Sequence, residues 1–198
     1  MPSTALVPAS VVVPAAEPIA GIVRTLDPAL LTAPTPCAAY DVRGLLQHLL
    51  FWGPVLEAAG RKEPTAPPAA AETDLDLVVG DWPAALDALL GRMVTAWSDP
   101  AAWEGATSMG GPTPMPAAMV GGMVVGELVV HGWDLGRALG LRPAWDEDVL
   151  AFVYRAVVAT AVMGREMGVY GPEVAVPGPA PTLDRLLGVT GRNPDWAP

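Results

Sequence analysis

The sequence predicts an all-α fold built as a helix bundle. Apolar residues recur every three or four positions in several segments, and this spacing places them on one face of a helix. No segment shows a convincing alternation of apolar and polar residues, the pattern of a half-buried strand. Helices joined by loops, without strands between them, are typical of a bundle.

Each expected helix has its own start or stop signals. Pro18 suits the first turn of the first helix and Pro83 that of the third, because first-turn N–H groups have no intrahelical partner. Asp41 is the expected N-cap of the second helix. Gly140, followed by Pro143, is a stop signal for the fourth helix. The five expected helices cover residues 17–31, 42–59, 81–97, 116–139 and 146–167.

The chain is expected to form a single domain over residues 1–198, because its length fits one domain and 52% of its residues are hydrophobic. Residues 1–16 are expected as an extended lead-in that is broken by two prolines. Residues 169–198 are dense in proline and are expected as an extended, loop-rich C-terminal tail, with a short helical turn near residues 183–187.

Charge and hydropathy argue against several classes of partner. The chain has 21 acidic and 11 basic side chains, with a net charge of −10, so we expect neither a nucleic-acid binder nor a protein bound to anionic membranes. The best candidate for a membrane span, residues 117–130, is short and is interrupted by Glu127. The single cysteine, Cys37, cannot form an intrachain disulfide, and no secretory signal is evident. We therefore expect a cytoplasmic protein.

Two histidines and one glutamate lie in apolar helical segments. His48 shares a helix face with several leucines, and His131 follows Glu127 by four residues, so these two project from the same side of one helix. A buried carboxylate without a partner is costly, and the nearest basic residue on this helix, Arg137, is more than two turns away. A divalent metal bound by His48, Glu127 and His131 would satisfy all three. Such a ligand set leaves coordination positions open, as in catalytic zinc sites.

Other interpretations stay open. A histidine on an apolar helix is usually a core residue bonded to a carbonyl, and Glu-x-x-x-His often marks a pair on a helix surface. Two histidines and a carboxylate also bind iron in oxygenases, although those enzymes are usually built on strands. Asp134 could orient an imidazole from one turn beyond His131, or could anchor a loop. Arg137 could bind a substrate carboxylate, or could lie at a solvated helix end.

Three segments of the chain resemble one protein family. They are residues 39–49 (AYDVRGLLQHL), 131–138 (HGWDLGRA) and 180–194 (APTLDRLLGVTGRNP). They are similar to segments of actinobacterial DinB/YfiT-like metal-binding proteins, on the branch of the mycothiol-dependent maleylpyruvate isomerase N-terminal domain. The resemblance implies a four-helix bundle, here with an additional helix and the C-terminal tail. It also implies a divalent metal, zinc first and nickel second, on His48, Glu127 and His131.

The resemblance further implies a low-molecular-weight thiol as cosubstrate. The function it implies is a thiol-dependent S-transferase or isomerase that acts on a small electrophile. The alternative is a non-catalytic, metal-stabilised module that binds a small ligand or a partner. Whether the chain is an enzyme, and whether it forms a homodimer, is left open.

The chain departs from the family pattern at several positions. Tyr40 and Asp41 stand where a Trp-Thr or Trp-Asp pair is commoner, and Gly44 stands where an aspartate is usual. Only a short tail stands where the isomerase has a second domain that contributes to its site. These departures weaken an expectation of isomerase activity and leave the expected ligands unchanged.

Overall fold

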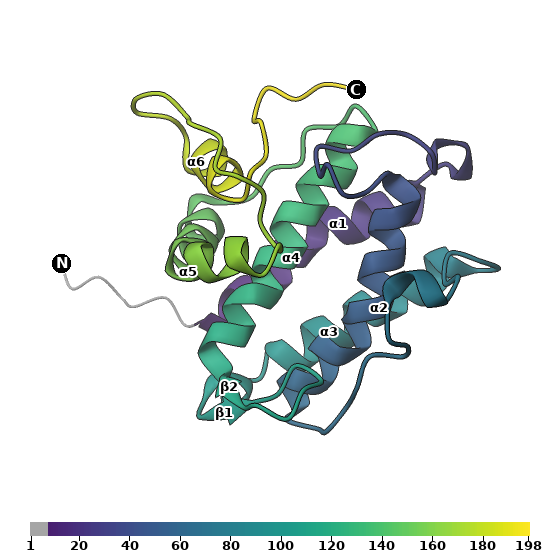
Figure 1. Cartoon of the computed structure of the whole chain (residues 1–198), viewed down its shortest axis with the longest axis vertical. Helices are drawn as coiled ribbons and strands as arrows, with labels where there is room; N and C mark the ends of the chain where they lie inside the picture. The colour runs from purple at the N-terminus through teal and green to yellow at the C-terminus, as the bar shows by residue number, and fades with distance from the viewer. Residues whose placement is uncertain (1–7) are drawn as a thin grey trace.

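The computed structural model describes residues 8–198 and shows an all-α fold (Figure 1), which confirms the predicted fold class. Within this range the regular structure consists of α-helices, short 3-10 helices and one small antiparallel hairpin that was not predicted. The α-helices are α1 (Val12–Thr25), α2 (Val42–Arg61), α3 (Trp82–Trp97), α4 (Ala117–Ala138), α5 (Glu147–Glu166) and α6 (Thr182–Val189), and the hairpin pairs β1 (Ala106–Thr107) with β2 (Met115–Pro116).

The first four helices pack against one another as a four-helix bundle. α1 contacts α3 and α4, and α2 contacts the same two helices. α5 packs against α4 outside this bundle, and α6 packs against α5. In Figure 1, α5 and α6 lie to the left of α4, and α2 and α3 lie to its right. α4 is therefore the central helix of the molecule.

Because α4 is covered on both sides, it buries most of its side chains. Val120, Val124, Leu128 and Leu135 are all fully buried. Removing each such side chain from water contributes roughly 1.5–3 kcal/mol to stability. Polar residues on the same helix are thus held in an apolar interior. Despite this composition, no helix in residues 8–198 is long and apolar enough to cross a membrane.

The expected N-terminal lead-in is wrong for residues 8–16, while residues 1–7 lie outside the described part of the chain. A 3-10 turn, Pro8–Val11, leads directly into α1, which begins five residues before its expected start. Val12 is fully buried, as are the residues that follow it on the same helix face. Pro14 is tolerated because it lies in the first turn, where N–H groups have no intrahelical partner. Burial against the bundle therefore extends this helix toward the N-terminus.

The first helix ends earlier than expected, and the second ends later. α1 stops at Thr25, and the Asp27 side chain then caps a separate 3-10 turn, Pro28–Leu30. A proline has no N–H to continue the helical hydrogen bonds, so the chain turns here. α2 continues to Arg61, and Lys62 ends it in a left-handed conformation with a φ of 58°. The ends of α3, α4 and α5 agree with the expected ones to within one residue.

The C-terminal tail is not extended throughout. The helical turn expected near residues 183–187 is the eight-residue helix α6, which buries Leu186 and Leu187. The Thr182 hydroxyl at its start donates to Oε1 of Glu147 at 2.6 Å, which joins α6 to α5. An eight-residue helix has about two turns, which is too short for its apolar residues to show a clear helical period in the sequence. Packing against α5 therefore completes a helix that the sequence only suggests.

Candidate metal centre

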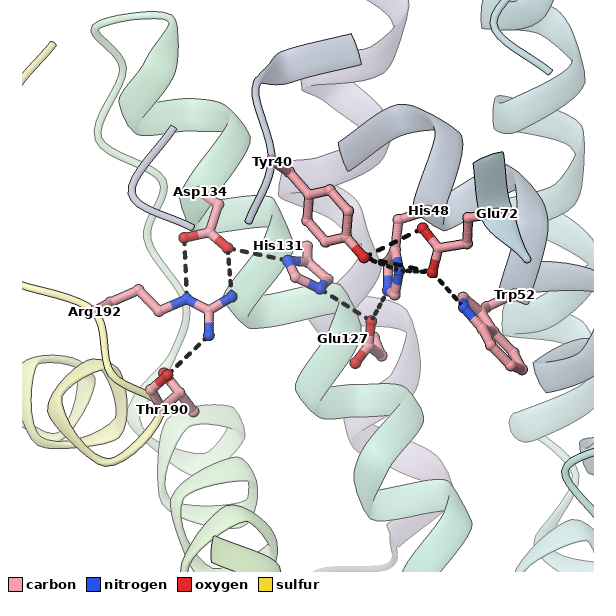
Figure 2. A network of polar contacts seen from close by, with 9 residues as sticks. All are labelled: Tyr40, His48, Trp52, Glu72, Glu127, His131, Asp134, Thr190 and Arg192. Carbon is pink, nitrogen blue, oxygen red and sulfur yellow. Dashed lines mark hydrogen bonds and ion pairs between the residues drawn. The ribbon is translucent and has the colours of Figure 1, made fainter. Parts of the chain in front are cut away.

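His48 on α2 faces Glu127 and His131 on α4 across the interior of the bundle (Figure 2). Nε2 of each histidine lies 3.2 Å from the same oxygen of Glu127, Oε2. Each residue offers one possible ligand atom such that all three atoms lie within 4.8 Å of one another. The one-turn spacing on α4 and the packing of α2 against α4 produce this arrangement. The structure thus brings the three expected ligands together.

The other nitrogen of each imidazole also faces a carboxylate. Nδ1 of His131 lies 3.0 Å from Oδ2 of Asp134, and Nδ1 of His48 lies 3.0 Å from Oε1 of Glu72. A carboxylate in this position fixes the ring orientation and raises the basicity of the remaining nitrogen. Both imidazoles are therefore held with Nε2 toward Glu127.

Asp134 contacts both the His131 imidazole and the C-terminal tail. Its side chain is fully buried, and it lies one turn beyond His131 and orients that ring. It also accepts hydrogen bonds from the guanidinium of Arg192, which follows α6 in the tail. Sequence reasoning missed Arg192, because a cation 58 residues away in a proline-rich segment carries no spacing signal toward Asp134.

Glu72 is a second residue that sequence reasoning missed. It lies in a short 3-10 helix, Glu72–Asp74, within the loop between α2 and α3. It accepts hydrogen bonds from Nε1 of Trp52 at 2.7 Å and from the Tyr40 hydroxyl at 3.2 Å. Acidic residues in a loop rich in proline and alanine usually lie in solvent, so nothing in the sequence distinguishes Glu72 from its acidic neighbours.

The loop that carries Glu72 is anchored by Gln47, the residue before His48. The Gln47 side-chain amide donates to the backbone carbonyls of Glu72 and Leu75 at 2.8 and 2.9 Å. Its Oε1 accepts from the backbone N–H of Leu77 at 2.8 Å. α2 therefore supplies both an expected ligand and the anchor of the loop that covers this ligand.

Burial and charge act in opposite directions on the protonation of the cluster. Burial lowers the pKa of His131, but the negative charge of Glu127 and the hydrogen bond to Asp134 outweigh burial and raise this pKa to about 10. Burial raises the pKa of the Glu127 carboxyl, but interactions with His131 and His48 hold it well below its usual range. Without a metal, Glu127 is thus ionised and His131 is cationic at neutral pH.

The donor set fits a divalent cation. Four ring nitrogens each face a carboxylate oxygen, and each of these contacts is a hydrogen bond only when the nitrogen carries a proton. A divalent cation beside the two Nε2 atoms would offset the negative charge of Glu127 without a proton on either nitrogen. Two imidazole nitrogens and one carboxylate oxygen are also typical ligands of zinc, and imidazole suits nickel.

The cluster is partly exposed to solvent. The side chains of Glu127, Glu72 and His48 are 25%, 22% and 17% exposed. Toward the bundle interior, a hollow of about 10 Å³ lies beside His48 and Glu127, and leucine and methionine side chains form most of its wall. This volume is about that of one water molecule. A larger ligand must therefore approach from the solvent side.

Arg137 lies against the C-terminal tail. Its Nη2 donates to the backbone carbonyl of Trp196, and its Nε is buried without a hydrogen-bond partner among the described residues. Arg137 therefore contacts the tail and none of the three expected ligands. The expectation that it binds a substrate carboxylate therefore gains no support from its position.

Most of the residues in the cluster lie in a segment that matches a known family. Residues 12–136 match the family model of the mycothiol maleylpyruvate isomerase N-terminal domain. The matched range covers more than half of the chain and includes the three converging residues and Asp134, whereas α5, α6 and Arg192 lie beyond it. No match is found among curated proteins or among solved structures. The chain therefore belongs to the family of mycothiol maleylpyruvate isomerase N-terminal domains.

Proposed function

We propose that the chain is a divalent-metal-dependent thiol S-transferase or isomerase, with His48, Glu127 and His131 as the metal ligands. The observation that carries this proposal is the approach of two Nε2 atoms to one Glu127 oxygen, each at 3.2 Å, inside an apolar bundle. Family membership supports a thiol of the mycothiol type as cosubstrate. Zinc is the first choice of metal and nickel the second.

When bound, the metal would lower the pKa of a coordinated thiol from its free value of about 8.5 and so provide a thiolate nucleophile. Asp134 and Glu72 would hold the two imidazoles with Nε2 free to act as a ligand. The pKa of Tyr40 is raised by burial and by the charge of Glu72, so its hydroxyl keeps its proton and cannot serve as a base at neutral pH.

The proposed partners are a small thiol and a small electrophile. Thiols of this kind stay reduced in the cytoplasm, where we place the reaction. A chain with a net charge of −10 has little attraction for nucleic acid or anionic membranes, so we propose neither as a partner.

The second candidate is a non-catalytic module that binds a metal for stability. One observation favours it: the hollow beside His48 and Glu127 holds about 10 Å³, so the interior side of the cluster has no room for a substrate. A metal between α2 and α4 would still cross-link two helices that are far apart in the sequence. The two candidates differ in whether a thiol reaches the metal.

The test uses full-length protein purified without a histidine tag and loaded with cobalt at one ion per chain. Cysteine, glutathione and mycothiol are each titrated across a range of pH. Binding of sulfur to cobalt should give an intense sulfur-to-metal absorption band, and proton release should accompany it, because the open position favours an anionic ligand. Thiol-dependent product formation is then scored by mass spectrometry with an added electrophile.

The outcomes separate the candidates. A sulfur-to-metal band with at least one thiol supports the transferase or isomerase. If all three thiols leave the spectrum unchanged at full cobalt loading, the thiol-dependent function is excluded and the metal-stabilised module becomes the better account. If the wild-type protein takes up neither cobalt nor zinc, the metal centre itself is wrong.

A further inference from the structure

The C-terminal tail reaches the candidate metal centre through one buried arginine. Arg192 donates from Nη2 to Oδ2 of Asp134 at 3.0 Å and from Nε to Oδ1 at 3.4 Å. The same Oδ2 lies 3.0 Å from Nδ1 of His131 (Figure 2). Arg192 is 6% exposed and Asp134 is fully buried, so the pair is removed from water. One carboxylate oxygen thus joins the tail to an expected ligand.

Hydrogen bonds at the end of α6 hold Arg192 in this position. The backbone N–H of Arg192 donates to the carbonyl of Leu187 at 2.9 Å, and Nη1 donates to the carbonyl of Thr190 at 2.9 Å. Gly191 makes the turn between them with a φ of 83°, and a Cβ at this position would lie 2.8 Å from the Cα of Gly171. A side chain at Gly191 would therefore both strain the backbone and displace the turn.

The arrangement restricts the geometry of the histidine. The planar guanidinium contacts both oxygens of Asp134 and so fixes the plane of the carboxylate. With this plane fixed, Oδ2 faces Nδ1 of His131 in the ring orientation that directs Nε2 toward Glu127. Without Arg192, a buried carboxylate would be left with one partner fewer and would be free to reorient.

We propose that Arg192 is a positioning residue for His131, so that the C-terminal segment completes a metal centre whose expected ligands all lie within residues 12–136. The proposal rests on the proposed function for the presence of a metal. The coupling from Arg192 through Asp134 to His131 is a property of the protein without metal and can be tested in its absence.

The metal-free test is nitrogen-15 NMR of the histidine rings, which is practical because the chain has two histidines. In Arg192→Gln, the Nδ1 proton of His131 should shift and exchange faster with water, while the signals of His48, whose Nδ1 faces Glu72 instead, should move less. Arg165→Gln is the matched control, because Arg165 donates to the Val189 carbonyl and holds the tail without contacting Asp134. This control should leave both histidines unchanged.

The metal-bound test is zinc affinity by competition with a chelator. Loss of the residue bonded to a metal-binding histidine, here Asp134, typically lowers affinity about 10–100-fold. Arg192 acts through Asp134, so we expect a loss of about tenfold in Arg192→Gln and less than about twofold in Arg165→Gln. If Arg192 acts through Asp134, then Arg192→Gln in an Asp134→Asn background should change the affinity less than about twofold.

Three results would overturn the proposal. The first is a folded Arg192→Gln with wild-type His131 signals, and the second is an equal loss of affinity in Arg165→Gln. The third is a full additional loss from Arg192→Gln in the Asp134→Asn background. If Arg192→Gln does not fold, Arg192→Lys replaces it in both tests, because it keeps the charge but cannot contact both oxygens. A wild type that binds no zinc would contradict the proposed function, while the NMR comparison would still decide the role of Arg192.

Discussion

At the scale of single residues, every charged group in the cluster has a partner of opposite charge or a hydrogen-bond donor. Glu127 faces two imidazoles, and Asp134 lies between an imidazole and a guanidinium. Glu72 accepts from an indole, a phenol and an imidazole. An unpaired buried charge costs free energy. Removing one of these residues therefore also destabilises the residue that was paired with it.

Glu127→Gln should abolish most metal binding. The substitution keeps the volume of the side chain but removes the negative charge and the anionic oxygen that both Nε2 atoms face. Metal content per chain should drop sharply, while the helical circular dichroism largely persists. Glu57→Gln is the control, because Glu57 is a buried carboxylate on α2 that pairs with Arg61 and Arg92 instead. Unchanged metal stoichiometry in Glu127→Gln would remove this residue from the ligand set.

Glu72→Gln should weaken metal binding without abolishing it. Glu72 contacts Nδ1 of His48 and orients the ring, and loss of such a contact typically costs about 10–100-fold in affinity. Asp76→Asn is the control. Asp76 lies in the same loop and pairs with Arg43 in a solvent-exposed ion pair, so its substitution should leave the metal affinity unchanged. Affinity is measured by chelator competition, and equal values for the two variants would show that Glu72 does not support His48.

The sequence allowed part of this cluster to be predicted. His48, Glu127 and His131 stand out because polar residues in apolar helical segments need a partner, and helical spacing places two of them on one face. Glu72 and Arg192 come from a loop and a tail, where no periodicity indicates which side chains point inward. Their positions depend on contacts such as those of Gln47, which only the folded chain reveals.

At the scale of elements, glycines on α4 set how closely its neighbours approach. A Cβ at Gly121 would lie 2.5 Å from the ring of Trp103. This ring is buried, and its Nε1 donates to the Trp97 carbonyl at 2.8 Å, so it has little freedom to move. A Cβ at Gly126 would lie 3.8 Å from Val157, which is ordinary van der Waals contact.

Alanine at these two positions should therefore have opposite effects. Gly121→Ala should destabilise the protein by roughly 1–3 kcal/mol, because the added methyl overlaps a buried indole. Gly126→Ala should stabilise it by roughly 0.5–1 kcal/mol, because alanine favours the helix and fits the space. Denaturant unfolding of both variants in the metal-free state measures the two changes. A destabilised Gly126→Ala with a neutral Gly121→Ala would contradict the described packing of α4.

The elements that the sequence predicts well are those whose apolar pattern and end signals agree. α3, α4 and α5 have both and begin and end within one residue of expectation. The predicted start of α1 is wrong because Pro14 and Pro18 indicate a break, with Pro18 expected in the first turn. The helix begins at Val12, which is buried, so Pro14 lies in the first turn and Pro18 lies inside the helix. Tertiary packing therefore overrides local signals at this helix start.

At the scale of the whole molecule, four separate segments meet at the cluster. They are α2, α4, the loop that contains Glu72 and the tail that contains Arg192. Because α6 and the tail contact α5 and α4 through side chains as well, we propose that residues 8–198 fold as one domain. Removal of a metal should accordingly affect the stability of the whole chain.

Chelation should lower the melting temperature of the wild type and leave His48→Ala nearly unaffected. A metal that binds only the native state stabilises it by RT ln(1+[L]/Kd), about 2.7 kcal/mol at a hundredfold excess over Kd. In His48→Ala, α2 contributes no imidazole to the proposed site, so we expect this linkage to be lost. Scanning calorimetry with and without chelator measures both proteins. An equal chelator effect in both proteins would argue against a shared site.

His131 and Glu127 should together stabilise the metal-free protein most on the acidic side of neutrality. The pKa of His131 is raised from 6.5 to about 10 in the native state, so its contribution to stability is complete below pH 6.5. This contribution is lost as pH rises from 6.5 toward 10. The pKa of Glu127 is lowered, so its contribution is present above its ordinary pKa of 4.5 and is lost as pH falls. The combined contribution of these two groups to stability without metal should therefore be largest between pH 4.5 and 6.5.

Bound metal should change the high-pH half of this profile. A metal takes His131 in its neutral form, so binding displaces a proton and strengthens as pH rises. The gap between the melting temperatures with and without zinc should consequently widen from pH 6.5 to 9. In His131→Asn, the decline of metal-free stability over this range should be smaller than in the wild type, because the group that loses the proton is absent. A metal-free wild type whose melting temperature rises between pH 6.5 and 9 would show that His131 does not hold this proton in the native state.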